Sequence, residues 1–123
     1  MREELAGCNA ALEDALGKPV RLMRPPHGAR RPDVLRAARE LGLTPVLWNA
    51  MGFDWRPGAT AAGIVEHLER GIARNRRHGR GSNLLLHDGG HVALGADRSQ
   101  SVEAARRVLE RYRVRYVTVD AWA

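Results

Sequence analysis

Three short apolar runs of the sequence each end on side chains that could perform acid–base chemistry. His87 and Asp88 directly follow the run 84–86, Asp54 comes shortly after a second run, and Arg24 closes a third. An imidazole gains or loses a proton near neutral pH, and a neighbouring carboxylate can orient the ring and stabilise its charged form. These residue types predict proton transfer, provided that the fold brings them together.

The elements that must position these residues alternate along the chain. Apolar residues at helical spacing predict four helices, from Glu3 to Leu16, from Pro32 to a cap at Gly42, from a cap at Thr60 through Ile72, and from Ser99 or Ser101 through Tyr112. Short apolar runs between them predict four strands, Val20–Met23, Pro45–Asn49, the buried run Leu84–Leu86, and Val114–Val119. On the last helix we expect Val102, Ala105, Leu109 and Tyr112 to face inward. Strict alternation predicts an α/β fold with one parallel sheet and helices covering it.

Parallel strands give this pattern a geometric consequence. Their carboxyl ends meet at one rim, so we expect Arg24, Asp54 and His87 to become neighbours there. Trp55 is adjacent to Asp54, and the alternation of side chains along a strand places Leu85 on the same side as His87. Trp55 and Leu85 are therefore predicted to line a small apolar pocket beside the imidazole.

Length and composition narrow the class of protein. The 123 residues predict a single domain over 1–123, and the sequence predicts neither a signal peptide nor a membrane span. The formal charge is +6, but all the basic residues except Lys18 are arginines and the densest run, 74–80, holds no aromatic residue for stacking on bases. We therefore expect no nucleic-acid partner. The single Cys8 leaves the cellular compartment open.

The order of these segments resembles a known family. Arg24-Pro25-Pro26-His27-Gly28, then Asp54-Trp55, then Leu84 to Asp88 are similar to the third, fourth and fifth motifs of the polysaccharide deacetylases, carbohydrate esterase family 4 or the NodB-homology domain. The resemblance implies a distorted (β/α) barrel, of which this chain would be the C-terminal part. It also implies a hydrolase that removes acetyl groups from amino-sugar polymers, such as chitin oligomers or peptidoglycan, with a divalent metal such as zinc.

The resemblance also assigns roles to residues. His87 would protonate the leaving amine, Asp54 would orient that imidazole and raise its pKa, and Arg24 would orient the catalytic aspartate of the family. The family's substrate-binding positions would fall on Pro26, His27 with its backbone N–H at the oxyanion, Gly28, Trp55, Leu85 and Asp88. Trp55 and Leu85 would form the slot for the acetyl methyl group.

Two motifs of the family have no counterpart in the sequence. They are the Thr-Phe-Asp-Asp type motif, which gives the base and one metal ligand, and the His-x-x-x-His type motif, which gives the other ligands. His87 and His91 are separated by two glycines, and His67 and His78 belong to the third helix or its end, so we expect no replacement metal site. The chain alone is predicted to be incomplete as a catalyst, and the open edge of its sheet is predicted to favour marginal stability or self-association.

The alternative is a non-catalytic carbohydrate-binding or interaction module derived from the same fold. This module would bind sugar oligomers through Trp55 and would be insensitive to chelators. A third reading, an anion or nucleic-acid binder, rests on charge alone and would require affinity that falls steeply with salt.

Overall fold

Each of the two sheets in the described part of the chain is a pair of short parallel strands. The computed structural model describes residues 1–90, 95–114 and 116–121. Strand β1 (Leu22–Met23) pairs with β2 (Thr44–Pro45), and β3 (Ala50–Met51) pairs with β4 (Leu84–Leu85). The two pairs belong to two separate compact units, 1–47 with the residues from Val117 onward, and Trp48–Tyr116. The α/β class and the parallel pairing are confirmed, whereas a single four-stranded sheet is not what the described residues form.

The predicted strand Pro45–Asn49 is wrong in its bounds. The backbone N–H groups of Thr44 and Val46 donate to carbonyls of 21–23, whereas the N–H groups of Asn49 and Ala50 donate to the carbonyl of Asn83. The chain thus leaves one partner strand and joins another within a few residues. The paired strands themselves cover 44–45 and 50–51, so most of the expected strand lies between two shorter ones.

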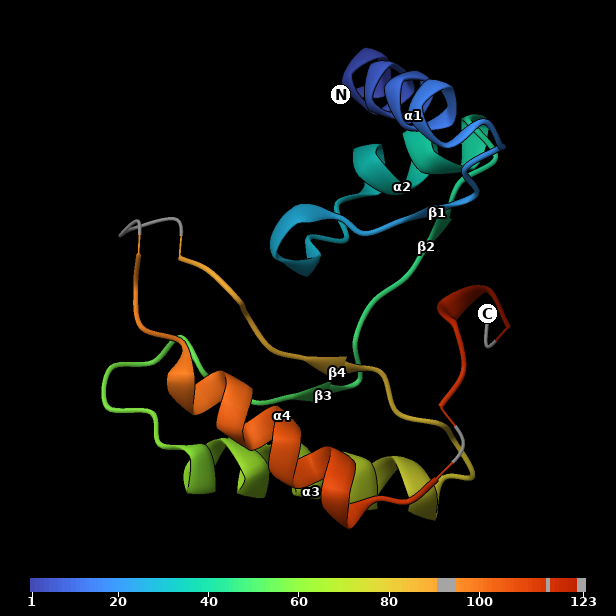
Figure 1. Ribbon diagram of the computed structural model, residues 1–123. Coiled ribbons are helices and arrows are strands. Elements are labelled where there is room, and N and C mark those ends of the chain that lie inside the picture. Colours follow the sequence, from blue (N-terminus) through green and yellow to red (C-terminus); the bar gives the residue numbers. More distant parts are fainter. Residues whose placement is uncertain (91–94, 115, 122–123) are drawn as a thin grey trace. The chain divides into compact units, whose positions relative to one another are not determined.

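The first unit contains the α-helices α1 and α2 besides the strands β1 and β2 (Figure 1). Helix α1 (Arg2–Leu16) ends at Gly17, whose φ of 63° is readily adopted only by glycine. The short 3₁₀ helix η1 (Pro26–Gly28) follows β1, and α2 (Pro32–Glu40) begins with a proline, as predicted. The face that α2 buries is formed by Val34, Ala37 and Ala38.

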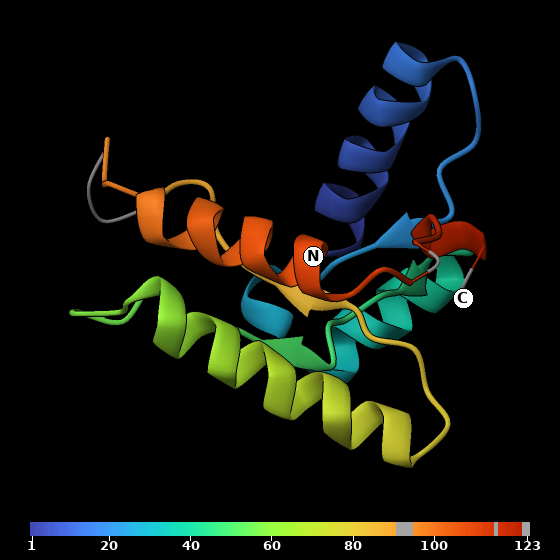
Figure 2. The same ribbon diagram turned by 60° about the horizontal axis from the view of Figure 1, so that its bottom comes forward.

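In the second unit, α3 (Ala61–Arg77) and α4 (Ser99–Arg111) lie side by side on one face of the β3–β4 pair (Figures 1 and 2). Helix α3 starts at the predicted cap, where the hydroxyl of Thr60 accepts a hydrogen bond from the N–H of Gly63. The core between the two helices holds residues of both, namely Ala61, Ile64, Leu68 and Ile72 of α3 and Ala104 and Val108 of α4. Leu84 and Leu86 pack against this core from the strand side, half-buried rather than fully buried as expected.

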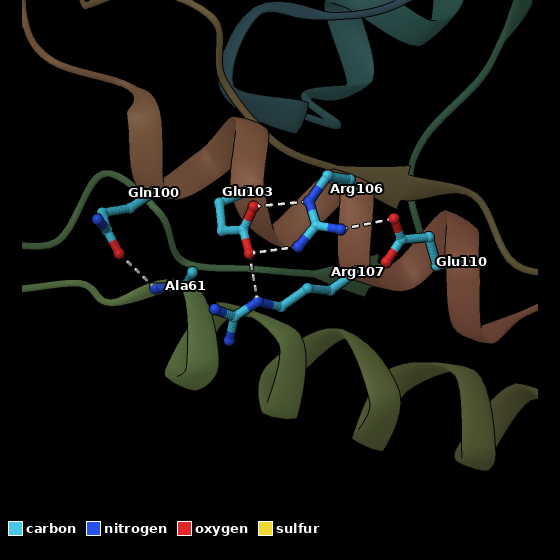
Figure 3. Close-up of polar contacts among 6 residues, drawn as sticks. All are labelled: Ala61, Gln100, Glu103, Arg106, Arg107 and Glu110. Atoms are coloured by element: carbon cyan, nitrogen blue, oxygen red, sulfur yellow. Dashed lines mark hydrogen bonds and ion pairs between the residues drawn. The ribbon is translucent and has the colours of Figure 1, made fainter.

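The predicted inward face of α4 is wrong at Val102 and Leu109, whereas Tyr112 packs against the core. Val102 and Leu109 are 67% and 56% exposed, whereas Ser101, Ala104 and Val108 are buried. Two polar contacts accompany this rotation of the helix. The hydroxyl of Ser101 donates to the carboxylate of Asp54. The Oε1 of Gln100 accepts from the N–H of Ala61 at 2.8 Å (Figure 3). Hydrophobic spacing alone could not have revealed either contact.

Charged residues cover the outer side of α4. Glu103 accepts hydrogen bonds from Arg106 and Arg107, and Arg106 also pairs with Glu110 (Figure 3). The hydrogen bonds from Arg106 and Arg107 lower the pKa of Glu103 to about 2. At its far end, α4 is tied to α3 by an ion pair of 2.7 Å between Arg111 and Glu69.

The predicted strand Val114–Val119 does not form in the described residues. Residues 112–114 and 116–118 have no regular structure, and the chain then enters the 3₁₀ helix η2 (Val119–Ala121). Val114, Tyr116 and Val117 are 46–59% exposed. A strand needs a neighbouring edge to satisfy its backbone groups, and no described strand pairs with this segment.

None of the helices in the described part of the chain has the length and hydrophobicity that a membrane span requires.

Candidate acid–base site at the ends of β3 and β4

The carboxylate of Asp54 is the centre of the polar contacts that follow β3 and β4. Its Oδ1 lies 2.8 Å from Nδ1 of His87, and its Oδ2 accepts from the backbone N–H of His87 at 2.7 Å. The hydroxyl of Ser101 donates to the same Oδ2 at 2.8 Å. The Asp54 side chain is fully buried, so these donors replace the water that it would otherwise bind. The predicted meeting of Asp54 and His87 is therefore present in the structure.

These contacts determine the charge of Asp54. Burial by itself would raise the pKa of the carboxyl group. The hydrogen bonds from the His87 ring, the His87 backbone and Ser101 outweigh burial, and the pKa of Asp54 lies below its ordinary value. Asp54 is thus an ionised acceptor at neutral pH.

The ionised carboxylate also determines the tautomer of His87. A carboxylate only accepts hydrogen bonds, so the proton of the 2.8 Å contact belongs to Nδ1 of the imidazole. The nitrogen that can exchange a proton with another molecule is then Nε2. The His87 side chain remains 39% exposed, whereas the Asp54 side chain is fully covered. This arrangement suits a proton donor or acceptor whose partner carboxylate is shielded from solvent.

Aromatic side chains flank the imidazole on the β3 side. The ring of Trp55 meets that of His87 edge to face at 5.2 Å, and Phe53 lies 5.5 Å from Trp55. Phe53 in turn contacts His67 of α3 at 5.0 Å, and the guanidinium of Arg56 lies 4.3 Å above the Phe53 ring. Trp55 is 45% exposed, so it can present apolar surface to a ligand beside His87.

The turn that delivers Asp54 and Trp55 contains an unusual backbone conformation. Phe53 has a φ of 56°, in the left-handed region that bulky residues rarely adopt. Such a conformation costs about 1–3 kcal/mol and persists only where surrounding contacts enforce it. The three ring contacts of Phe53 and the fixed carboxylate of Asp54 supply that enforcement.

Two residues at the start of α4 complete the site, Ser101 in its first turn and Arg98 directly before it, and the sequence did not assign them to it. Ser101 was predicted only as a candidate start of the helix, yet its buried hydroxyl binds Asp54. Arg98 donates from Nη1 to the backbone carbonyl of Asp54 at 3.3 Å. A serine near the start of a helix normally indicates a cap, so no sequence signal distinguishes this role.

The other predicted site residues are placed as follows. Leu85 lies in β4, and its neighbours Leu84 and Leu86 pack toward α3 and α4, which agrees with the predicted alternation. Asp88 is exposed in the turn after His87.

The remaining predicted residues belong to the first unit. Arg24 and Pro26 are exposed, and Gly28 is half-buried at the end of η1. His27 is exposed and has a φ of 54°. Their predicted roles remain expectations.

A second polar cluster lies at the opposite ends of β3 and β4. Asn49 accepts the N–H of Asn83 on its side-chain oxygen and donates to the carbonyl of Gly81. The buried amide of Asn75 in α3 donates to Ser82 and to the carbonyl of Asn49. These groups lock the beginnings of the two strands and lie away from His87, so we interpret them as structural.

The described residues do not fit a divalent metal. Nowhere in 1–90, 95–114 and 116–121 do three or more His, Cys, Asp or Glu side chains come together as ligands. His87 and Asp54 bind each other, which leaves a set too small for a hydrolytic metal site. His91, considered above as a partner of His87, lies outside the described residues.

The sequence is similar to those of known proteins. Residues 1–46 match the polysaccharide deacetylase family. The bifunctional xylanase/xylan deacetylase of Cellvibrio japonicus is 35% identical over 90 residues, which cover 73% of this chain and 12% of that protein. The peptidoglycan-N-acetylglucosamine deacetylase of Bacillus cereus is 36% identical over 105 residues, which cover 80% of this chain and 43% of that protein. The chain thus spans less than half the length of either relative.

Solved structures share the fold. A pseudoenzyme of carbohydrate esterase family 4 from Bacillus anthracis matches 89% of this chain and 34% of its own, with a TM-score of 0.67 and 22% identity. The family 4 carbohydrate esterase of Streptomyces lividans was solved in complex with acetate. It matches 89% of this chain and 48% of its own, with a TM-score of 0.61 and 25% identity. The β/α arrangement around the Asp54–His87 pair is therefore one that larger proteins also contain.

Proposed function

The chain belongs to the polysaccharide deacetylase family, carbohydrate esterase family 4, and on this premise we propose that Asp54 and His87 form the proton-donating half of a hydrolytic deacetylase site. The observation that carries the proposal is the 2.8 Å contact between Nδ1 of His87 and the buried, ionised carboxylate of Asp54. It leaves Nε2 as the atom that exchanges protons. A general acid needs this combination of a fixed ring and one available nitrogen.

The proposed reaction is hydrolysis of an acetylated sugar. An amine leaves an acyl carbon poorly unless it is protonated, so the imidazolium of His87 would give its Nε2 proton to the leaving nitrogen as the carbon–nitrogen bond breaks. Water supplies the oxygen of the acetic acid that is released. Asp54 holds the ring throughout and stabilises the imidazolium before the proton leaves.

The substrate class that we propose is an acetylated amino-sugar polymer, such as chitin oligomers or peptidoglycan. The Bacillus cereus relative supports this choice, because its name is peptidoglycan-N-acetylglucosamine deacetylase. The Cellvibrio japonicus relative is named for xylan, so acetylated xylan is the substrate to compare. Exposed Trp55 offers an apolar surface beside His87 for the acetyl methyl group, with Leu85 as the second predicted contact.

The groups that hold the family's metal are not found among the described residues, so no step of the proposed reaction is assigned to a metal here. The proposal accordingly gives this chain the acid half of the chemistry. Arg24 and the backbone of His27 keep their predicted roles in orienting the family's aspartate and binding the oxyanion.

The test is acetate release from N-acetylglucosamine oligomers and from acetylated xylan, with Zn²⁺ or Co²⁺ added. We expect little or no release by the chain alone. A fusion that places the preceding segment of the Bacillus cereus relative before Met1 should release acetate, and His87→Ala in that fusion should lower the rate by about 10²-fold or more. His78→Ala is the matched control, since His78 only caps the end of α3. A fusion whose activity survives His87→Ala would contradict the proposal, as would strong activity of the chain alone.

The second candidate is a carbohydrate-binding module without catalysis. The observation that favours it is the exposed Trp55 beside a polar pair, in a chain whose described residues gather no metal ligands. This module would bind N-acetylglucosamine oligomers with an affinity that Trp55→Ala lowers and a chelator leaves unchanged. Binding of this kind, together with a fusion that stays inactive, would favour the module over the hydrolase.

A further inference from the structure

The contact between Ser101 and Asp54 makes the first turn of α4 part of the acid–base pair. Oδ2 of Asp54 receives two donors, the backbone N–H of His87 at 2.7 Å and the hydroxyl of Ser101 at 2.8 Å. Among the residues that the structure describes, Oδ1 receives only the His87 ring. Without Ser101, every side-chain contact of the carboxylate in the described part of the chain would come from His87 itself, and the pair would lose its independent anchor.

Several contacts fix the position of Ser101. Gln100, its neighbour, accepts the N–H of Ala61 at 2.8 Å and so ties the start of α4 to the start of α3 (Figure 3). Arg98 donates to the backbone carbonyl of Asp54 at 3.3 Å. Ser101 is only 5% exposed, so no solvent competes for its hydroxyl. The hydroxyl is thus presented to Asp54 by a turn that is anchored on both sides.

From this geometry we propose that Ser101 is a positioning residue for His87 and acts through Asp54. The inference rests on the proposed function, because it concerns the same proton donor. Ser101 holds the plane of the carboxylate so that Oδ1 faces Nδ1 of the imidazole. The ring is thereby kept in the tautomer that leaves Nε2 available for proton exchange.

The test reads the tautomer of His87 directly. The chain is labelled with ¹⁵N-histidine, and nitrogen spectra are recorded at about pH 9, above the ordinary titration range of imidazole. The signals of His87 are those that disappear in His87→Gln. In the unmodified chain we expect a single tautomer with the proton on Nδ1.

Three variants separate positioning from a merely structural role. Ser101→Ala should raise the share of the Nε2–H tautomer severalfold while the chain still unfolds cooperatively. Ser101→Thr, which keeps a hydroxyl, should restore the original spectrum. Ser99→Ala is the matched control on the same turn, since the Ser99 hydroxyl donates to exposed Asp97 at 3.0 Å and its loss should leave His87 unchanged.

Each outcome decides one question. An unchanged spectrum in Ser101→Ala would overturn the role of Ser101 while leaving the Asp54–His87 pair intact. A change that Ser101→Thr does not reverse, or a Ser101→Ala chain that no longer folds, would also overturn it, since Ser101 would then be a packing residue. An Nε2–H tautomer in the unmodified chain would instead remove the pair on which the proposed function depends.

Discussion

His87 contacts the carboxylate of Asp54 twice, once with its ring and once with its own backbone. The ring nitrogen lies 2.8 Å from Oδ1 and the backbone nitrogen 2.7 Å from Oδ2. One residue thus engages both oxygens of its partner, which couples the orientation of the imidazole to the path of the chain as it leaves β4. The acid–base pair is therefore built into the end of the strand and does not depend on a mobile side chain finding its partner.

Replacing Asp54 by asparagine tests this coupling. The amide keeps one acceptor oxygen but cannot accept from both the His87 ring and the two donors at Oδ2. We expect the free energy of unfolding to fall by about 1–3 kcal/mol, because buried donors lose an acceptor. Urea denaturation measures the loss. Asp88→Asn, in the exposed turn after His87, is the control and should change stability little.

Stability should fall in acid because of Asp54. Its pKa is lower in the folded chain than its ordinary value of 3.8, so the unfolded chain binds that proton more readily. The stabilisation is complete above about pH 5 and is lost as the pH falls through the folded pKa. Urea midpoints measured across this range should therefore decline, and the difference between the unmodified chain and Asp54→Asn should shrink as the pH falls.

Other acidic groups define the control for this pH dependence. The pKa values of exposed Asp97 and half-buried Glu103 are also lowered, by hydrogen bonds from Ser99 to Asp97 and from Arg106 and Arg107 to Glu103. Because the pKa of Glu103 is about 2 in the folded chain against an ordinary value of 4.5, Glu103 also favours proton uptake by the unfolded chain near pH 4, and Glu103→Gln should remove a separate part of the decline. If Asp54→Asn kept the same slope as the unmodified chain, Asp54 would not be the source of the decline.

Helix α3 approaches β3 so closely that Gly71 has no room for a side chain. A Cβ at this position would lie 2.6 Å from the Cβ and 2.9 Å from the Cα of Ala50. Gly71→Ala should cost about 1–3 kcal/mol through overpacking, which exceeds the gain of about 1 kcal/mol in helix propensity. Thermal and urea unfolding measure the effect.

Gly63, in the same helix, is the matched control for Gly71. Its added Cβ would meet only the Thr60 hydroxyl, at 3.4 Å. Gly63→Ala should therefore be neutral or stabilising by up to about 1 kcal/mol. Equal effects at the two glycines would show that helix propensity, and not the contact with Ala50, governs the stability of this packing.

The buried amide of Asn75 should affect stability without affecting His87. Asn75→Ala removes the donors to Ser82 and to the carbonyl of Asn49, and we expect a loss of about 1–3 kcal/mol. The His87 tautomer should stay unchanged, because this cluster lies at the opposite ends of the strands. Exposed Arg76, in the last turn of α3, provides a control in Arg76→Ala. A tautomer change in Asn75→Ala would show that the two ends of the strands are coupled.

The sequence predicted the Asp54–His87 contact because parallel topology alone brings strand ends together. Both residues follow a paired strand, and the pairing of Ala50 with Leu84 and of Met51 with Leu85 puts those ends in register. The α3 core was also predictable, since its apolar spacing is regular. In both cases a short-range pattern coincided with the tertiary structure.

The parts that were not predicted depend on contacts that have no local signature. The rotation of α4 follows from the polar contacts of Ser101 and Gln100, whereas the pattern of Val102 and Leu109 favoured another face. The apolar run over 114–119 is typical of a strand, but a strand also needs a partner edge, and the described residues supply none there.

The left-handed backbone at Phe53 sets the stability of this turn against the aromatic contacts that the Phe53 ring makes. Glycine adopts this conformation without strain, so a chain selected only for stability would favour glycine immediately before Asp54. Glycine there would also remove the ring that supports Trp55 beside the imidazole. Relaxing that turn with glycine would therefore loosen the contact between Trp55 and His87, and extra stability that keeps the proposed site intact would have to come from another part of the chain.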